Sequence, residues 1–395
     1  MNATLIGAGI GVAVALFLTA LPWASAIGMI GRGSLRTSRF WMVGLVSSVV
    51  LGALLGFYLQ ENNDTKVLGH WGRFLFSVFH LQLGLDLFVF AILFLLRFWP
   101  KGGAVALAAF QEGVRQPKFW LLLIIGVVAM AISTVVPFFT FGEDLKVVKE
   151  LCYVAAMILP CLFGILAASI SVAEEIEGRT AITLMSKPIT RRDFLLGKFV
   201  GIAFAAMAMS IVLGWLLVWI VLYKDFIDPP IGGQVPPDPN WVTQFSNSVG
   251  RGALVDLVRG MCLWVHDAGE ALPGLVIGFS QIFVLTALAV ALATRVPMLV
   301  NLVVCLVVYF LGHLTTILTE ATAKGNPLIR FLANVFDTVL PGLDLFDVGP
   351  AIIRDVPLPF TAYSIYAGQV TLYGLIYTAI ALLLGLILFE DRDLA

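Results

Sequence analysis

The side chains in this sequence that could carry acid, base or nucleophilic chemistry are few and far apart. The chain has four histidines and no H-E-x-x-H motif for zinc. No lysine precedes a serine or threonine, so the phosphate-binding loop G-x-x-x-x-G-K-[ST] is missing. The remaining acidic pairs, Asp344 with Asp347 and Asp391 with Asp393, fit a loop and a solvated tail. We therefore expect no catalytic residue and no metal site, and an intramembrane enzyme is kept only as an alternative.

The densest group of charges lies between Glu174 and Gly201, with nine charged residues in 28 positions. Charged side chains are costly inside a bilayer, so this stretch must lie in water or against protein. It also carries the apolar residues Ile182, Leu184 and Met185. Apolar residues on a charged segment need cover, which a partner protein would supply.

The same stretch predicts a short helix, a break and a second helix. Thr180 to Met185 fits one or two helical turns, which Pro188 ends. Thr190 and Asp193 form a T-x-x-D signal that caps a new helix. The charged stretch thus connects two apolar runs through a structured turn.

The composition indicates an integral membrane protein. Hydrophobic residues make up 60% of the chain and charged residues 12%, against roughly 25% charged in soluble domains. The mean hydropathy is +0.98. A net charge of -1 gives no basic field for nucleic acid, so no nucleic-acid partner is expected.

Crossing the bilayer takes about 20 apolar residues in a helix. On this criterion we expect an all-α polytopic bundle of about nine transmembrane helices. The first run contains an A-x-A pattern at Ala24 to Ala26 that resembles a signal-peptidase site. We prefer a retained helix, because no lysine or arginine precedes the run. The expected spans are 4–30, 41–60, 74–98, 119–141, 150–172, 197–222, 272–293, 296–318 and 365–389.

Three further stretches have one apolar face each. Residues 104–115 follow a break at Gly102 and Gly103 and predict an amphipathic elbow helix on the membrane surface. Residues 250–267 and 326–342 predict short outer interfacial helices.

The orientation follows from the basic residues, which favour cytoplasmic loops. In the expected topology, 14 of the 24 lysines and arginines fall within about 60 residues of loop on one side, and the other ten spread over about 120 residues. We expect a multi-pass protein of the bacterial cytoplasmic (inner) membrane, with its N-terminus outside and its C-terminus cytoplasmic.

The charged stretch resembles the cytoplasmic segment of ABC-2 type transporter permeases. That segment begins with an E-x-E-x-G-T-like sequence, continues as L-[LM]-S-[KR]-P-[IV]-[ST]-R and reaches a G-K in the next helix. Over about 104–395 the order of elements is also similar: an elbow helix, six spans and short re-entrant helices before the last span. Three extra spans and a long outer loop at 223–271 depart from the pattern. The residues that fit the motif are Glu175, Glu177, Gly178, Thr180, Leu184, Ser186, Lys187, Pro188, Arg191, Gly197 and Lys198.

The resemblance implies an exporter subunit without ATPase activity of its own. A separate ABC ATPase subunit would bind ATP and Mg, and a second permease chain, alike or different, would complete the transporter in the lipid bilayer. Residues 1–100 would form an extension of three helices, and 101–395 the permease domain with coupling segment 173–198. A membrane anchor that recruits an ATPase without transport is a further alternative. The residues implied in ATPase coupling are Glu174, Glu175, Glu177, Gly178, Arg179, Thr180, Leu184, Ser186, Lys187, Pro188, Arg191 and Arg192.

Two smaller features concern the apolar runs. Asp86, with Gln82 one turn earlier, is a possible buried polar site such as a proton or cation site, or an interhelical hydrogen bond. Gly7 with Gly11, and Gly52 with Gly56, have the G-x-x-x-G spacing of close helix contacts. The four cysteines lack metal-ligand spacing and are expected to be buried packing residues.

Overall fold

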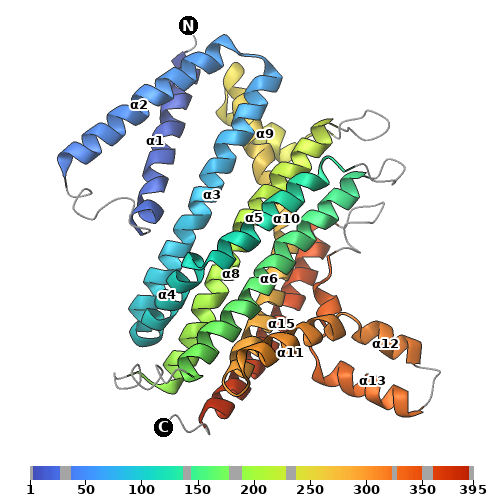
Figure 1. The fold of residues 1–395 in the computed structure, drawn as a ribbon. Helices are drawn as coiled ribbons and strands as arrows, with labels where there is room; N and C mark the ends of the chain where they lie inside the picture. Colours follow the sequence, from blue (N-terminus) through green and yellow to red (C-terminus); the bar gives the residue numbers. More distant parts are fainter. Residues whose placement is uncertain are drawn as a thin grey trace. The chain divides into compact units, whose positions relative to one another are not determined.

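The computed structural model describes residues 3–26, 37–136, 144–177, 189–227, 237–322, 327–348 and 359–390. Over these ranges every regular element is helical, and no strand occurs (Figure 1). The predicted all-α membrane bundle is confirmed.

Seven helices are long and apolar enough to cross a membrane. Six of them contain an expected span and extend beyond it at one end or both, because the polar turns at their ends are also helical; α1 ends at Ala26, and the rest of the expected span 4–30 lies outside the described residues. The chain is therefore a multi-pass membrane protein. The seven helices are α1 (Ala3–Ala26), α2 (Ser38–Glu61), α3 (Thr65–Phe98), α6 (Asp144–Glu177), α8 (Arg191–Ile227), α10 (Ala253–Ala293) and α15 (Phe360–Glu390).

The other two expected spans are shorter than predicted. Helix α5 (Pro117–Ser133) has 17 residues and α11 (Met298–Gly312) has 15. At 1.5 Å per residue they rise about 25 Å and 22 Å, less than the roughly 30 Å of the hydrocarbon core. Helix α5 forms a pair with α4 (Pro100–Arg115), bent by 59° where they meet, and the pair together is long enough to count as an eighth span.

Helix α4 is the predicted elbow, but it begins earlier than expected. The predicted break at Gly102 and Gly103 is absent, since the helix begins at Pro100, a residue suited to a first turn. Both glycines lie where a side chain would not fit. A Cβ on Gly102 would meet the ring of Trp99, and one on Gly103 would lie 3.0 Å from the carbonyl oxygen of Leu95.

The two long connections between the later spans contain more helix than predicted. Helix α9 (Asn240–Val249) was not expected. Most of the amphipathic stretch 250–267 is the first part of α10, which begins at Ala253 and continues through Pro273 without a break, rather than a separate helix. Helix α13 (Pro327–Val339) matches the predicted amphipathic helix, and α12 (Thr315–Thr322) precedes it.

A 3-10 helix, η2 (Leu343–Phe346), follows α13 and is fixed to α15. The backbone N–H of Gly342 donates to the Tyr373 hydroxyl at 2.9 Å, and the Tyr366 hydroxyl donates to the carbonyl of Leu345 at 2.7 Å. Tyr373 lies about 20 Å along α15 at 1.5 Å per residue. The segment before the last span is therefore bound to α15 as far along as Tyr373, near the middle of that helix.

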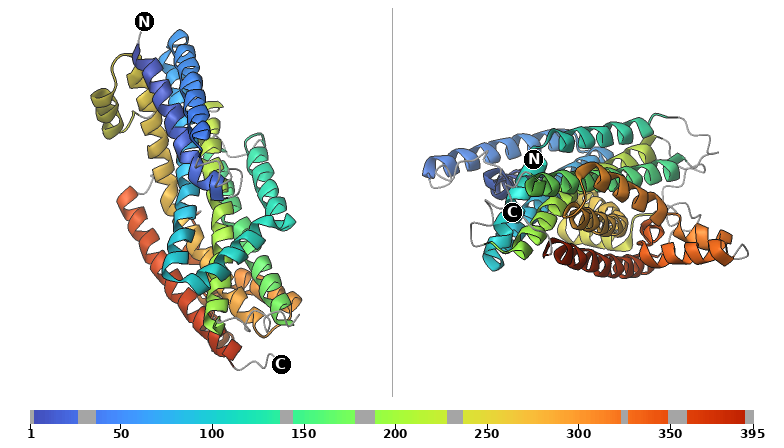
Figure 2. Two further views of the ribbon diagram at one scale, coloured as in Figure 1. Left: turned by 90° about the vertical axis from the view of Figure 1, so that its left-hand side faces the viewer. Right: turned by 60° about the horizontal axis from the view of Figure 1, so that its bottom comes forward.

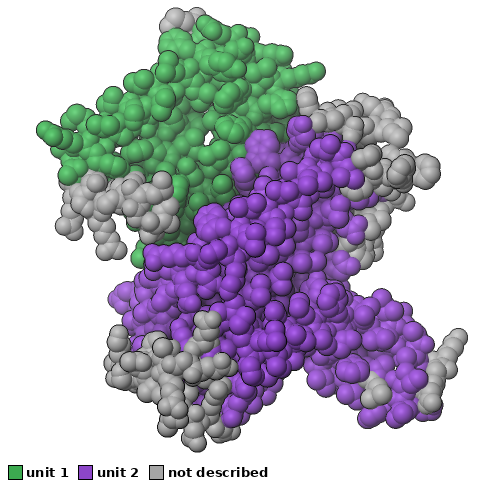
Figure 3. All heavy atoms as spheres, viewed as in Figure 1, with its two compact units in different colours: residues 1–93, 232–270 green, residues 94–231, 271–395 purple. Residues whose placement is uncertain are grey.

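The chain divides into two compact units (Figure 3). Unit 1 comprises residues 1–93 and 232–270, and unit 2 comprises 94–231 and 271–395. The sequence expectation placed a boundary near residue 100. In the structure, residues 232–270 group with the first three helices.

Unit 1 is held together by close helix contacts and one apolar cluster. Gly52 and Gly56 contact the backbone of α1, as their spacing predicted, and the glycine of α1 that lies against both of them is Gly9. The prediction for Gly7 and Gly11 was wrong, because a Cβ on either would meet nothing within 4 Å. The buried cluster consists of Leu59, Leu68, Leu75 and Leu257.

Unit 2 is built around α6 and α8, which lie side by side (Figures 1 and 2). The Ser210 hydroxyl on α8 donates to the carbonyl of Ala156 on α6 at 2.7 Å. Helix α5 packs on α6 through Phe119 and Phe163, whose ring centroids are 5.3 Å apart. All four cysteines of the chain are free and buried, as predicted.

Candidate coupling site

The predicted coupling residues divide into those that the structure describes and those that it does not. Gly178, Arg179, Thr180, Leu184, Ser186, Lys187 and Pro188 lie outside the described residues. Glu174 and Glu177 lie in the last turns of α6, and their side chains lie outside the described part. What remains are the two ends of the segment: Glu175 at the end of α6, and Arg191 and Arg192 at the start of α8.

The first end is fixed by Lys198, a buried lysine on α8 that is only 4% exposed. Its ammonium donates to Glu175 Oε1 at 2.6 Å and to Glu112 Oε2 at 3.2 Å. It also donates to the Ser171 hydroxyl at 2.7 Å, and that hydroxyl donates to Glu112 Oε2 at 3.2 Å. One cation thus joins three helices: α4 through Glu112, α6 through Ser171 and Glu175, and α8.

The energetics of this cluster favour keeping it intact. A buried charge is costly unless it is paired and hydrogen-bonded, and Lys198 has both kinds of partner. Removing one partner of a buried pair leaves the other charge uncompensated. Movement of α6, α8 or α4 that separated these groups would therefore be resisted.

The second end is fixed by the predicted capping box. The Thr190 N–H donates to Asp193 Oδ2 at 3.2 Å, and the Asp193 N–H donates to the Thr190 hydroxyl oxygen at 3.1 Å. Helix α8 begins at the next residue, Arg191. The other carboxylate oxygen, Asp193 Oδ1, accepts a 2.6 Å hydrogen bond from the indole N–H of Trp99, the residue before α4.

Both ends of the segment are therefore bound at the elbow helix. The first end is bound to Glu112 within the helix, and the second end is bound to Trp99, the residue just before it. The helix surfaces between them lie in close contact. A Cβ on Gly197 would lie 2.7 Å from the carbonyl oxygen of Gly102, and one on Gly201 would lie 2.7 Å from Ala109 Cβ. This spacing of small residues lets the backbones of α8 and α4 approach each other.

Arg191 lies against the last turn of α15. Its Nη1 donates to the carbonyls of Phe389 at 2.6 Å and Glu390 at 2.7 Å, and its guanidinium carbon lies 5.5 Å from the centre of the Phe389 ring. Arg295 donates to the neighbouring carbonyl of Leu388 at 2.7 Å. Cations at a helix C-terminus interact favourably with its dipole. Arg192, by contrast, is exposed.

Sequence reasoning missed several members of this site. Lys198 fitted the G-K of the motif but was not assigned a role, and Glu112 and Trp99 were not considered. The sequence feature that could have identified Lys198 is its position as a lone lysine one turn inside an apolar run. Its partners could not be read from the sequence, because they come from two other helices.

The predicted buried polar site lies in unit 1. Gln82 Oε1 accepts a 2.5 Å hydrogen bond from the Thr19 hydroxyl on α1. Asp86 is 6% exposed, and its Oδ1 has no hydrogen-bond partner among the described residues. In the part of the chain that the structure describes, no three His, Cys, Asp or Glu side chains form a metal-binding group.

In comparison with known protein families, the chain matches one family model. A family model described as "ABC-2 family transporter protein" matches residues 104–394, which is well over half of the 395 residues. The match begins within α4 and ends just beyond α15, so it includes every residue of the coupling site except Trp99. No curated protein matches the chain.

Proposed function

Because the chain belongs to the ABC-2 family of transporter membrane proteins, we propose that it is the membrane subunit of an exporter driven by a separate ATP-binding subunit. That partner binds ATP and Mg and supplies the hydrolysis, while this chain supplies the path across the membrane. A second permease chain completes the transporter. The protein lies in the bacterial inner membrane, with the coupling site on the cytoplasmic side.

The observation that carries this proposal is the fixation of both ends of the charged segment. Glu175 is bound by Lys198, which also binds Glu112, and Asp193 is bound by Trp99. A force that the ATP-binding subunit applies to residues 178–188 would therefore reach α4, α6 and α8 together. A loosely tethered loop would absorb such a force instead.

In this mechanism the residues divide into docking and transmitting groups. Glu174, Glu177, Gly178, Arg179, Thr180, Leu184, Ser186, Lys187, Pro188 and Arg192 form the docking surface. Glu175, Glu112 and Lys198 transmit the movement to the helices. Arg191 connects the start of α8 to the end of α15 through two carbonyls, so the last span moves with α8.

The test separates docking from transmission. In the first variant, Glu177→Ala is combined with Arg179→Ala, and we expect the cognate ATPase to copurify less with the full chain. In the second variant, Glu112→Gln removes one carboxylate from Lys198 and leaves Glu175 in place. Copurification should then persist, while stimulation of ATP hydrolysis by the chain should fall severalfold.

The control is Glu150→Gln, a change on α6 outside the coupling site, which should alter neither measurement. If the double variant copurifies as the unaltered chain does and stimulation is also unchanged, the segment is not the docking site. A chain that binds the ATPase but moves no substrate in vesicles would be an anchor rather than an exporter.

A further inference from the structure

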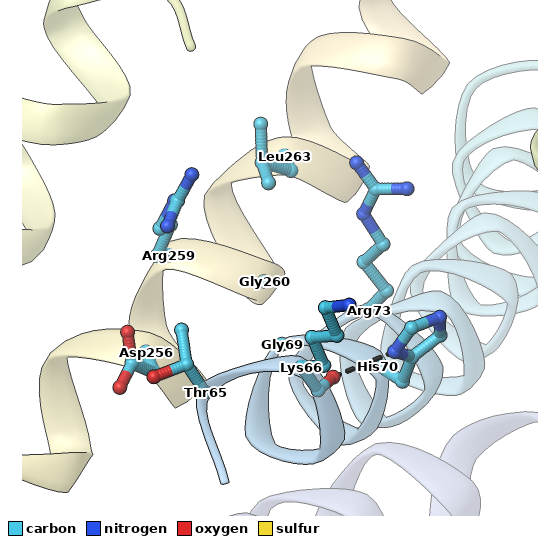
Figure 4. Close-up of a pocket in the computed structure, with 9 residues that line it drawn as sticks. All are labelled: Thr65, Lys66, Gly69, His70, Arg73, Asp256, Arg259, Gly260 and Leu263. Atoms are coloured by element: carbon cyan, nitrogen blue, oxygen red, sulfur yellow. Dashed lines mark hydrogen bonds between the residues drawn. The ribbon is translucent and has the colours of Figure 1, made fainter. Parts of the chain in front are cut away.

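Unit 1 contains a cavity of about 210 Å³ between the first turns of α3 and the first turns of α10 (Figure 4). Its polar lining is mostly basic. Lys66, His70 and Arg73 come from α3, and Arg259 and Asp256 come from α10. In Figure 4, Thr65 of α3 lies beside Asp256 of α10, whereas Lys66, His70 and Arg73 lie on the other side of Gly260 from Arg259.

Next to the cavity, the two helices cross closely at glycines. A Cβ on Gly260 of α10 would lie 3.0 Å from Gly69 Cα, and one on Gly72 of α3 would lie 3.0 Å from the backbone nitrogen of Met261. The spacings i, i+4 and i+7 place Lys66, His70 and Arg73 on one face of α3. The apolar face of α10 packs in the core through Leu257, so its polar face is left to line the cavity.

Two of the cations are already held in position by carboxylates. Arg73 Nη2 lies 3.6 Å from Asp267 Oδ2, and Arg259 Nε donates to Asp238 Oδ2. A guanidinium has five N–H donors, so one carboxylate contact leaves donors for a ligand. Among the described residues the Lys66 ammonium makes no hydrogen bond or ion pair. The lining therefore holds three permanent cations and the carboxylate of Asp256. Two of the cations are also paired with Asp267 and Asp238, and in the described part of the chain Lys66 is the cation without such a pair.

The position along α3 suggests the source of an anion. Helix α3 has 34 residues and is about 51 Å long, whereas the hydrocarbon core is about 30 Å thick. Its first turns therefore extend to the depth of the lipid phosphates. In the expected topology this is the outer side, where basic residues are sparse, so a basic cluster there needs a reason other than orientation.

We propose that this cavity binds a phosphate-type oxyanion, either the phosphate of a phospholipid headgroup or a soluble phosphate. Arg73 and Arg259 offer planar pairs of donors that match phosphate oxygens, and Lys66 adds a third charge. The residues that line the site belong to unit 1, whereas the coupling residues belong to unit 2, and the proposal does not depend on the proposed function.

The test uses the full chain purified in neutral detergent, with one arm for each source. In the first arm, native mass spectrometry counts phosphatidylglycerol bound per chain during a titration, with phosphatidylcholine as the neutral comparison. In the second arm, isothermal calorimetry measures inorganic phosphate. One arm should show saturable binding at one site per chain, and that arm identifies the source.

The variants are Lys66→Gln, Lys66→Gln combined with Arg259→Gln, and the control Arg251→Gln, an exposed residue that does not line the cavity. Losing one charged hydrogen bond should weaken the saturable binding about tenfold or more, and the control should leave it unchanged. The double variant also breaks the contact of Arg259 with Asp238. Lys66→Gln breaks no such pair, so it remains decisive if the double variant does not fold.

Absence of saturable binding in both arms would overturn the proposal. So would equal binding by the unaltered chain, the Lys66→Gln variant and the control in the arm that binds.

Discussion

Lys198 carries a positive charge at a position that is only 4% exposed, and its two carboxylate partners offset the cost of that burial. Replacing it by methionine would keep the volume and remove the charge. Glu175 and Glu112 would then lie close together without a counterion, although Glu112 is partly solvated. The same residue thus stabilises the fold and connects the coupling segment to the helices.

We expect Lys198→Met to lower the free energy of unfolding by about 1–3 kcal/mol, less than a fully buried pair would lose because Glu112 meets water. Equilibrium unfolding in mixed detergent and SDS would measure it. Lys149→Met, on α6 away from the coupling site, should change this free energy little. A Lys198→Met chain as stable as the unaltered one would show that the ion cluster contributes nothing to the fold.

At the scale of helices, the contact between α4 and α8 depends on the absence of side chains. A Cβ on Gly201 would overlap the carbonyl oxygen of Ala106, and it would lie 2.7 Å from Ala109 Cβ. The backbone cannot give way as the end of a flexible side chain can. The elbow helix would have to move away from α8, and with it the attachment of both ends of the coupling segment.

Gly201→Ala should therefore destabilise the chain by about 1–3 kcal/mol through overpacking. The matched change is Gly368→Ala on α15, where a Cβ would meet nothing within 4 Å. There the substitution should be neutral or stabilise by up to about 1 kcal/mol, because alanine is the better helix former. Thermal unfolding of both variants measures the change in stability. If the midpoints of both variants shifted in the same direction, the result would contradict the close contact between α4 and α8 at Gly201.

The helices show what the sequence could predict. Long apolar runs located the seven long spans, and T-x-x-D located the start of α8, because both signals are local. G-x-x-x-G spacing identified Gly52 and Gly56 but not their partner Gly9, since spacing does not say which face of a helix meets another. The continuity of α10 through Pro273 was missed because an amphipathic stretch followed by an apolar run resembles two helices.

For the coupling site, too, the sequence predicted the local features and not the contacts between distant residues. The motif identified the charged segment and the capped start of α8. It did not show that Arg191 would lie on the carbonyls of α15, or that Glu112 and Trp99 would hold the two ends. These contacts join residues that are far apart in the chain, at least 86 residues for Glu112 with Lys198, and only the packing of helices brings them together.

At the scale of the whole molecule, two departures from the family pattern turn out to be connected. The sequence has three extra spans at its start and a long outer loop at 223–271. In the structure, residues 232–270 form one compact unit with residues 1–93, and Leu257 of the loop segment completes the cluster of Leu59, Leu68 and Leu75. The insertion thus supplies the packing surface that the three extra helices require.

The coupling site faces the cytoplasm only if the chain has the expected orientation in the membrane. Single cysteines can test it in a background in which the four native cysteines, all buried, are replaced. Asn63, between α2 and α3, and Ser248, on α9, are exposed, as is Gln111 on the elbow helix. If basic loops face the cytoplasm, a membrane-impermeant maleimide added to intact cells should label positions 63 and 248. Position 111 should react only after the membrane is permeabilised, and the reverse pattern would place the coupling site outside, beyond the reach of any cytoplasmic ATPase.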